Sequence, residues 1–600
     1  MKFPYGSCDF YKIITQGRFY MDRTDRIPLI EEAGEHLLFL RPRRFGKSLL
    51  LSVLENYYDV AKADEFDRLF GHLKIGKSPT PSHNQYLVMS WDFSAVDPQG
   101  TPAQTRCALH DHINGCIEQF NIRYRDILDY EIQLDPNNAL RSFQSVLAAV
   151  QSSKYKLYLL IDEYDNFANE VLMGGHSESG GRYEKLLIGE GAVKTVFKAV
   201  KSATRGLGLD RAFITGVSPV VMSDITSGHN IAENISLLPE FNDLCGFSDA
   251  EVTSTLERIV RECDFPSEKA GEAAGMMRKF YNGYRFCPRS DDLLHNPTLA
   301  LYFMKAFQKY CEYPEEMLDE NLAMDRGKLA YISGLAGGED LITDALSGGE
   351  PLSIHRLARR FGVEDMLKAP KDRTFMISLL YYFGVLTLSR HRTEIGEHVL
   401  RIPNLVIRKL YAEQIQEMLL PDTNRDEALH AAKVFCSTGD IQPLCDFMEQ
   451  RYFRAFDNRD YRWANELTVK TAFLTLLFND TFYIMDSEPE LGRTYSDLVM
   501  IVRPDMRQYK LLDILIEFKY VPLGKNRLTG KQVRAMDMTA LAALDPVKKK
   551  LTEAKTGLAE YRQKLRDIHG QKLRLSSYAV VAVGFERLVW EKVKGEGHPC

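Results

Sequence analysis

Short apolar runs alternate with helical patterns over the first part of the chain. Four such runs predict buried strands: His36–Leu40, Tyr86–Ser94, Lys156–Phe167 and Asp210–Val220. Apolar residues at helical spacing follow the first strand and fill much of the stretch between residues 101 and 152. Strands that alternate with helices are typical of a parallel sheet with crossover helices. The sequence therefore predicts an α/β domain over residues 1–248.

The next region is mostly helical, and we expect it to form a separate domain over residues 249–425. Three apolar segments follow one another near its end: Ser353–Gly362, Phe375–Ser389 and Val399–Tyr411. Their patterns fit a helix, a second helix, and a hairpin followed by a third helix. This order is compatible with a winged-helix module.

A second α/β domain is predicted over residues 426–600. Three apolar runs predict its strands: Tyr495–Val502, Leu511–Val521 and Ser576–Phe585. The segment Val547–Lys572, which lies between the second and third runs, has a helical pattern rich in lysine and arginine. Such a run is usually the solvated face of a helix, but beside a catalytic site it can also contact a phosphate backbone.

Composition narrows the class of protein. A chain of 600 residues is too long for a single core, and its 26% of charged residues is ordinary for a globular protein. The net charge of −6 argues against a protein coated in positive charge to hold nucleic acid, although it leaves room for a local basic patch. The ten cysteines form no CxxC pair, which argues against a zinc site. Because no apolar run reaches the length of a membrane span, we expect a cytoplasmic protein.

The stretch RPRRFGKSLLLSVLENYY, residues 41–58, ends like a phosphate-binding loop. In such loops backbone N–H groups at a helix N-terminus bind phosphate oxygens, a lysine neutralises the β- and γ-phosphates, and a hydroxyl holds Mg²⁺. Lys47 and Ser48 have these identities, and they lie between a predicted strand and a predicted helix. The usual loop has a glycine where this chain has Arg41, so a basic turn capped by serine is the alternative.

Two further predicted strands end in polar residues that a nucleotide-hydrolysing enzyme requires. The run YLLIDEYDNF, residues 158–167, delivers Asp162 and Glu163. We expect Asp162 to bind Mg²⁺ and Glu163 to act as general base toward the attacking water. Thr215 can contact the γ-phosphate or that water, or it can simply cap its strand. A strand followed by an acidic turn is the alternative for the acidic pair, but both motifs in this order within one α/β unit favour a nucleotide site.

These stretches, together with FITGVSPVVMSDITSGHNIAENISLLPEFNDLCGFSDAEV, NGYRF and HNPTLALYFM, resemble the bacterial AAA-ATPase-like family over roughly residues 5–300. In that family the loop typically reads RPRRFGK, so the resemblance implies that Arg41 is a family trait. A site that turns ATP over slowly, as a switch would, suits this loop as well as a fast motor does. The resemblance implies a P-loop ATPase that binds ATP and Mg²⁺ through Arg43, Arg44, Phe45, Gly46, Lys47, Ser48, Leu49, Asp162 and Thr215.

A second group of catalytic residue types lies near the C-terminus. Asp497 begins an apolar strand, whereas Glu517 and Lys519 lie two apart in the next strand, so these two side chains point to the same face. If the two strands pair, two carboxylates and an ammonium group meet at one point. Such a cluster can hold one or two Mg²⁺ ions, which would activate a water and stabilise charge on a phosphodiester. The alternative is an amphipathic edge strand, which often shows the same acid-x-lysine pattern.

This constellation resembles the PD-(D/E)XK nuclease superfamily over about residues 430–600, and such a domain is often attached to AAA-ATPase-like proteins. The resemblance implies that Asp497, Glu517 and Lys519 are catalytic and that the two acids bind the metal, with Glu466 as a further metal ligand. Ser496 replaces the leading proline of the motif. Mn²⁺ is an alternative to Mg²⁺ at this site. The alternative for Glu466 is an ordinary glutamate on a helix surface.

These observations predict an α/β enzyme with two sites, in which an N-terminal ATPase switches or gates a C-terminal restriction-endonuclease-like domain. The nuclease would act on nucleic acid, with DNA favoured over RNA. One alternative is an ATP-dependent regulator or sensor whose nuclease-like domain only binds nucleic acid or a partner. The other is a nuclease whose ATPase half is a scaffold, against which the complete set of nucleotide-site residues argues. A homo-oligomer is compatible with the sequence, and no membrane contact is expected.

Overall fold

The computed structural model describes twelve stretches of the chain. They are residues 1–96, 102–166, 195–219, 232–318, 326–347, 351–358, 361, 372–420, 424–456, 465–486, 498–526 and 528–593. The chain divides into two compact units. Unit 1 comprises Met1–Cys311, Ala330–Gly338 and Leu352–Pro403, and unit 2 comprises Glu312–Leu329, Glu339–Pro351 and Asn404–Cys600. The division into three domains after residues 248 and 425 stays a prediction.

Unit 1 is built on a five-stranded parallel sheet with the order β2-β3-β4-β1-β5. Its strands are β1 (His36–Leu40), β2 (Tyr86–Asp92), β3 (Lys156–Asp162), β4 (Leu209–Gly216) and β5 (Glu233–Asn234). The first four confirm the α/β pattern of the sequence. The two exposed residues of β5 carry no apolar pattern that could predict a strand. Because β4 lies between β1 and β3, the carboxyl ends of these three strands are neighbours.

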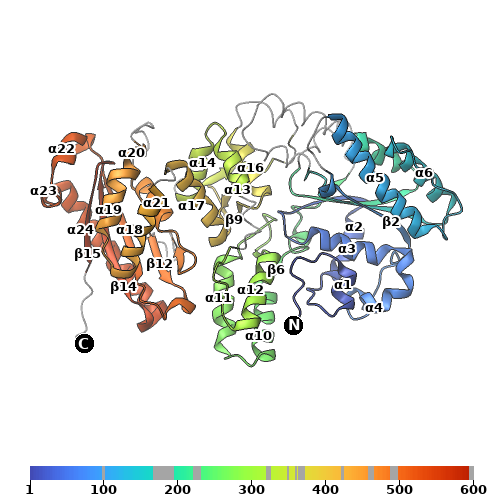
Figure 1. Cartoon of the computed structure of the whole chain (residues 1–600), viewed down its shortest axis with the longest axis horizontal. Coiled ribbons are helices and arrows are strands. Elements are labelled where there is room, and N and C mark those ends of the chain that lie inside the picture. The colour runs from blue at the N-terminus through green and yellow to red at the C-terminus, as the bar shows by residue number, and fades with distance from the viewer. Residues whose placement is uncertain are drawn as a thin grey trace. The chain divides into compact units, whose positions relative to one another are not determined.

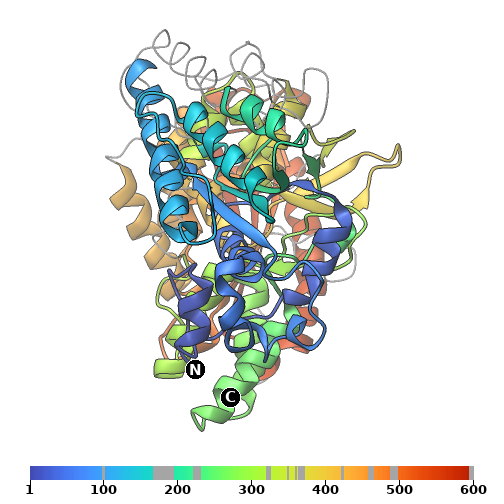
Figure 2. The ribbon, with the colours of Figure 1, turned by 90° about the vertical axis from the view of Figure 1, so that its right-hand side faces the viewer.

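Helices cover both faces of this sheet (Figure 1). On one face, α5 (Pro102–Tyr124) contacts β2, and α6 (Ala139–Ser152) contacts β3 while running beside α5 (Figures 1 and 2). On the other face, α3 (Lys47–Tyr58) contacts β2, β3 and β4. Three short helices complete this part: α1 (Phe10–Thr15), α2 (Ile27–Ala33) and α4 (Phe66–Phe70). The inner strands are buried on both faces, as expected for a parallel sheet between helices.

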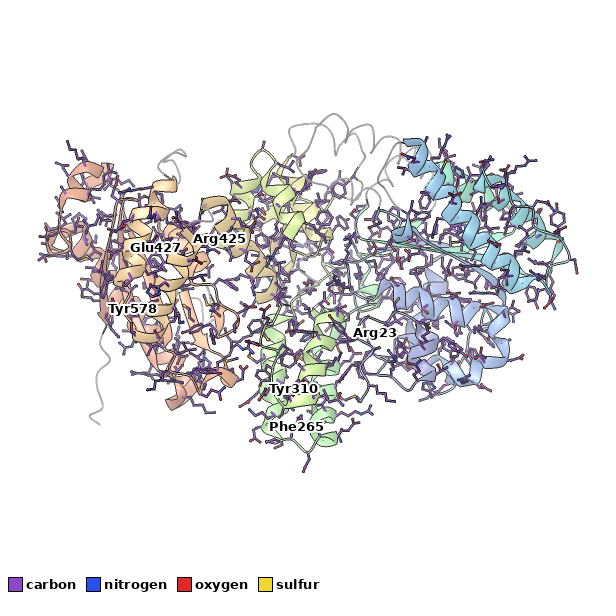
Figure 3. The ribbon with its side chains drawn as sticks, viewed as in Figure 1. Arg23, Phe265, Tyr310, Arg425, Glu427 and Tyr578 are labelled. Carbon is purple, nitrogen blue, oxygen red and sulfur yellow. The ribbon has the colours of Figure 1, made fainter. Side chains whose placement is uncertain are left out.

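Three helices follow the sheet in unit 1: α10 (Asp249–Glu262), α11 (Glu268–Phe280) and α12 (Pro297–Tyr310). The short strands β6 (Phe247–Ser248) and β7 (Leu294–His295) pair antiparallel just before α10 and α12. A capping box between Ser248 and Glu251 begins α10. Arg23, labelled in Figure 3, pairs with Glu251 and donates to the carbonyl oxygen of Gly246. The N-terminal segment is therefore fastened to the start of α10.

Unit 1 also contains a three-stranded antiparallel sheet and α16 (Arg373–Tyr382). The strands are β8 (Leu352–Ile354), β9 (Thr387–Arg392) and β10 (His398–Arg401), in the order β8-β10-β9. The predicted hairpin is confirmed. The predicted helix over Ser353–Gly362 is wrong at its start, because Ser353 and Ile354 pair with β10. Leu352 and Ile354 are buried on either side of the half-buried Ser353, which is the alternation of a strand.

Unit 2 is built on a mixed five-stranded sheet with the order β11-β12-β13-β14-β15. Its strands are β11 (Tyr483–Asp486), β12 (Leu498–Val502), β13 (Asp513–Val521), β14 (Leu575–Val583) and β15 (Arg587–Val593). Only β13 and β14 are parallel, and the predicted basic helix, α24 (Asp545–His569), connects them and packs on both. The middle three strands confirm the predicted ones, and β11 and β15 are additional edges.

Further helices belong to unit 2. They are α17 (Leu405–Leu419), α18 (Arg425–Thr438), α19 (Gln442–Phe447), α20 (Phe453–Phe456), α21 (Glu466–Leu477), α22 (Gly530–Ala535) and α23 (Met538–Ala543). Two others, α13 (Arg326–Ser333) and α14 (Gly338–Ser347), include residues of both units. Phe473 of α21 packs on Phe518 of β13, with ring centroids 4.9 Å apart. In the described stretches no helix is long and apolar enough to cross a lipid bilayer.

Candidate nucleotide and metal sites

The predicted phosphate loop forms the connection between β1 and α3. Gly46 is the N-cap of α3 and has a left-handed φ of 95°, and Arg44 has a left-handed φ of 66°. The helix therefore begins at Lys47, one short turn after the carboxyl end of β1. A helix N-terminus at the carboxyl edge of a parallel sheet attracts anions such as phosphate.

The residues before Gly46 anchor this loop. Arg41 is buried, and its guanidinium group donates to the carbonyl oxygens of Leu40, Ser236 and Phe241. Arg43 donates to Asn166 Oδ1 over 2.9 Å, and the carbonyl oxygen of Arg44 accepts from Thr298 Oγ1 over 3.0 Å. The buried ring of Phe45 packs against the rings of Tyr284 and Phe286. The NGYRF stretch is thus a direct packing partner of the loop.

Lys47 and Ser48 lie next to the two acids at the end of β3. The Lys47 ammonium group donates to the carbonyl oxygens of Arg41, over 3.1 Å, and Pro42, over 3.2 Å. It is also 3.5 Å from Glu163 Oε1. The Ser48 side chain lies close enough to Asp162 to lower the pKa of its carboxyl group against the effect of burial. Leu49, the next residue of α3, is half-buried.

The sheet order brings Thr215 to the same carboxylate. Thr215 Oγ1 donates to Asp162 Oδ1 over 2.5 Å, and the backbone N–H of Glu163 donates to the same oxygen over 3.0 Å. Glu163 itself has a left-handed φ of 50°, which is uncommon for a residue other than glycine and often marks a functional site. Five predicted residues from three elements therefore meet at one point: Lys47, Ser48, Asp162, Glu163 and Thr215.

Burial raises the pKa of the Asp162 carboxyl group above its ordinary value. The hydrogen bonds from Ser48 and Thr215 and the positive charge of Lys47 oppose this effect but do not cancel it. A divalent cation would favour the ionised form, because it replaces the lost water with a positive charge. A carboxylate beside a hydroxyl oxygen is also the ligand type that Mg²⁺ prefers.

Asp165 supports this site and was missed from the sequence. Its side chain is fully buried and accepts hydrogen bonds from the backbone N–H groups of Val217 and Ser218 and from the Ser218 hydroxyl group. It thereby fastens the segment after β3 to the segment after β4, which keeps Asp162 beside Thr215. The only signal in the sequence was a further aspartate close behind an apolar strand.

In unit 2, Lys519 bridges two of the predicted metal ligands. Its ammonium group donates to Glu517 Oε1 over 2.9 Å and to Glu466 Oε1 over 3.0 Å. Glu466 is the first residue of α21 and follows the N-cap residue Asn465. The structure therefore brings Glu466, Glu517 and Lys519 together. The fourth predicted residue, Asp497, lies outside the described residues.

Glu517 has the properties of a metal ligand. Burial raises the pKa of its carboxyl group, and Lys519 opposes that shift only in part. In the described part of the chain Glu517 Oε2 has no hydrogen-bond partner, which is rare for a buried polar atom. Gly557 of α24 lies beside it, since a Cβ atom there would be 3.6 Å from that oxygen. Lys470, buried on α21, adds positive charge nearby and was not recognised from the sequence.

A complete metal-ligand set is not found within the described ranges. There, no group of three or more His, Cys, Asp and Glu side chains is arranged to hold a metal ion. Glu466 and Glu517 supply two acids of the predicted set, and Asp497 belongs to a part of the chain outside those ranges. The metal assignment at this second site therefore stays a prediction.

Parts of this chain are similar to known proteins. Residues 4–226 match the sequence model of a family described as "Predicted AAA-ATPase". A protein of Azotobacter chroococcum mcd 1, described as "Uncharacterized protein in vnfD 5'region", is 23% identical over 451 residues, which are 74% of this chain and 74% of that protein. The structure of the Aeropyrum pernix Orc1 protein in complex with DNA aligns with 11% identity and a TM-score of 0.25, covering 67% of this chain and 95% of that one. At this TM-score the likeness says nothing about fold or partner. Residues 4–226 of this chain are therefore similar to AAA-ATPase-like domains.

Proposed function

We propose that this protein binds ATP together with Mg²⁺ at the loop between β1 and α3 and hydrolyses the γ-phosphate. The match of residues 4–226 to the AAA-ATPase-like family supports this proposal. The observation that carries it is the Asp162 carboxylate, which accepts a hydrogen bond from Thr215 and lies close to Ser48 and Lys47. A structural acid would need no lysine and no second carboxylate beside it.

Each residue of the site has a role in this proposal. The backbone N–H groups from Gly46 to Leu49 receive the phosphates, with Phe45 fixing the loop and Arg43 and Arg44 adding positive charge. Lys47 neutralises the β- and γ-phosphates. Ser48 and Asp162 hold Mg²⁺, which when bound supplies positive charge against the charge that develops during phosphoryl transfer. Glu163 takes the proton of the attacking water, and Thr215 orients Asp162.

Two variants test the ATPase proposal. Lys47→Ala should abolish ATP binding measured by calorimetry, whereas Lys12→Ala, which changes an exposed lysine on α1, should leave it unchanged. Glu163→Gln should keep ATP binding but lower the hydrolysis rate by roughly 10²- to 10⁴-fold, the usual contribution of a general base. Unchanged ATP affinity in Lys47→Ala would refute the site.

We further propose that unit 2 is a metal-dependent nuclease that cleaves phosphodiesters of nucleic acid, with DNA favoured, and that the ATPase gates it. The bridge from Lys519 to Glu466 and Glu517 and the buried Glu517 Oε2 support this reading. In it, Glu466, Glu517 and Asp497 hold Mg²⁺ or Mn²⁺, which would activate a water. Lys519 positions that water and stabilises the developing negative charge. The alternative is a regulator in which this domain binds nucleic acid without cutting it.

Cleavage assays separate these two readings. The purified protein is incubated with plasmid and with single-stranded DNA, with Mg²⁺ or Mn²⁺, and with or without ATP. Metal-dependent cutting that is lost in Glu517→Ala but kept in Glu560→Ala, an exposed glutamate of α24, would establish the nuclease. A change with ATP would show that the two activities are coupled. Binding without cutting, also with RNA as substrate, would favour the regulator.

A further inference from the structure

The residue that departs from the usual phosphate loop, Arg41, is a buried cation that forms no ion pair with any acid in the described stretches. Its side chain is 1% exposed. The guanidinium group lies between two aromatic rings, 4.3 Å from the centroid of Phe39 and 4.2 Å from that of Phe286. Its hydrogen bonds go to backbone carbonyl oxygens, over 2.8 Å to Leu40, 2.9 Å to Ser236 and 2.7 Å to Phe241. Of the carboxylates that the structure describes, none forms an ion pair with it.

Such a site gives the guanidinium group no carboxylate in direct contact among the described residues, and Asp243 acts on it only through its charge at a distance. Burial lowers the pKa of the Arg41 guanidinium to about 10, so it is still protonated at neutral pH. Carbonyl dipoles and ring faces stabilise a cation, but they carry no net charge of their own. A buried charge without a counter-charge is costly, and it acts over a longer range than an exposed one because little water screens it.

The backbone of Arg41 joins this charged residue to the loop. Its backbone N–H donates to the carbonyl oxygen of Gly216 at the end of β4, and its own carbonyl oxygen accepts from the Lys47 ammonium group over 3.1 Å. Arg41 is therefore one hydrogen bond away from the lysine that is proposed to meet the β- and γ-phosphates. Lys47 is paired with Glu163 at 3.5 Å, so part of its own charge is already neutralised.

We propose that Arg41 makes this loop selective for nucleoside triphosphates over monophosphates, by supplying a buried positive charge that only a chain of phosphates offsets. It is a positioning residue that acts through the loop and touches no phosphate itself. The proposal rests on the ATP site proposed above. An AMP molecule brings one phosphate to the loop, whereas ADP and ATP bring two and three, so the attraction grows along the series.

The test is a comparison of affinities for AMP, ADP and an ATP analogue with a non-hydrolysable β–γ bridge, each with Mg²⁺, by calorimetry. Arg41→Met removes the charge but keeps an apolar side chain between the two rings. We expect the analogue to bind about tenfold more weakly, ADP a few-fold more weakly and AMP within about twofold of the unmodified protein. Arg41→Lys keeps the charge and should keep the ratio of the affinity for the ATP analogue to the affinity for AMP.

A matched control separates charge from general loss of structure. Arg503 in unit 2 is also fully buried and donates to the carbonyl oxygens of Asp480, over 3.0 Å, and Pro314, over 3.0 Å. Unlike Arg41, it also pairs with a carboxylate, Asp505, over 2.7 Å. Arg503→Met should therefore lower the melting temperature without changing the affinity ratio. If Arg41→Met does not fold, Arg41→Lys still tests the proposal. This variant keeps the charge, so a loss of the ratio between the affinities for the ATP analogue and for AMP would overturn the proposal.

The outcomes distinguish this inference from the proposed ATPase. An unmodified protein that binds none of the three nucleotides would refute the ATP site itself. If the unmodified protein binds but Arg41→Met loses the same factor for all three, or loses nothing, the ATP site stands and the role of Arg41 is refuted.

Discussion

Divalent metal ions should stabilise this protein through Glu517. The carboxylate is buried, and its Oε2 lacks a hydrogen-bond partner among the residues that the structure describes. Leaving such an oxygen unsatisfied costs about 1–3 kcal/mol, which a bound cation would offset. At a free Mn²⁺ concentration of about 100 times the dissociation constant, binding to the folded state alone adds about 2.7 kcal/mol of stability. For a folding unit of roughly 150–250 residues this corresponds to a rise in melting temperature of about 5–10 °C.

The effect should depend on pH in a definite direction. Burial raises the folded-state pKa of Glu517 above its value in the unfolded chain. Without metal, the ionised group therefore lowers stability at neutral pH, and this penalty disappears as the pH falls below the raised pKa. Metal binding needs the ionised form, so protons compete with Mn²⁺. The stabilisation by Mn²⁺ should be largest at neutral pH and should fade on acidification.

Differential scanning calorimetry with a series of Mn²⁺ concentrations measures this shift. Glu517→Gln, which keeps the size of the side chain, should abolish the shift, whereas Glu560→Gln on the exposed side of α24 should retain it. A melting temperature of the unmodified protein that does not respond to Mn²⁺ would refute the metal site at Glu517. An equal shift in Glu517→Gln would place the responsible ion elsewhere.

Three other substitutions test buried residues in the two units. Gly384→Ala should destabilise the protein by about 1–2 kcal/mol and weaken ATP binding, because Gly384 has a left-handed φ of 80° and a Cβ there would lie 2.7 Å from Pro42 Cβ in the loop. An unchanged free energy of unfolding in urea would contradict this. Asp513→Asn should cost about 3–5 kcal/mol, since this buried carboxylate pairs with Arg507 over 2.6 Å, and a loss below about 1 kcal/mol would be the opposing result. Burial lowers the pKa of His295 to about 4. The protein should therefore lose up to about 3 kcal/mol of stability as the pH falls from 6.5 toward 4. In His295→Gln, urea titrations at several pH values should show a weaker dependence of the free energy of unfolding on pH.

Local sequence pattern predicted the parts of the fold that bury continuous apolar runs. The strands β1, β2, β3 and β4 and the helix after the loop were predicted, since each contains its own hydrophobic signal. The two-residue strand β5 was not, because both of its residues are exposed and its pairing with β1 depends on tertiary context. For the same reason Ser353 and Ile354 were placed in a helix, although cross-strand partners hold them in β8.

The candidate site residues were predicted from their chemistry, but the residues that surround them and hold them in place were not. A lysine, a hydroxyl and two acids are visible in the sequence, and Lys47 at the start of α3 does lie near Asp162 at the end of β3, with β4 between β1 and β3. The support from Asp165 and the buried position of Lys470 depend on residues far away in the chain, so no local pattern reveals them. The same is true of Gly557, whose missing side chain matters only because Glu517 lies against it.

The loop tolerates the absence of the usual glycine because its tight turns fall elsewhere. Its two left-handed residues are Arg44 and Gly46, while Arg41 extends the chain from β1 and bonds β4 through its N–H group. A left-handed arginine costs roughly 1–2 kcal/mol. The hydrogen bond from Thr298 to the carbonyl oxygen of Arg44 and the burial of Phe45 hold the strained residue in place.

Arg41 is therefore free to do something that a glycine cannot. Its side chain donates to the Phe241 carbonyl oxygen and packs over the ring of Phe286. The backbone carbonyl oxygen of Phe286 in turn accepts a hydrogen bond from Tyr381 of α16. A change in the loop on nucleotide binding would strain this chain of contacts directly, since its members are packed or hydrogen-bonded to one another without intervening solvent. Within unit 1, the residue that breaks the general loop motif thus connects the proposed nucleotide loop, through Phe286, to α16, which the hairpin follows.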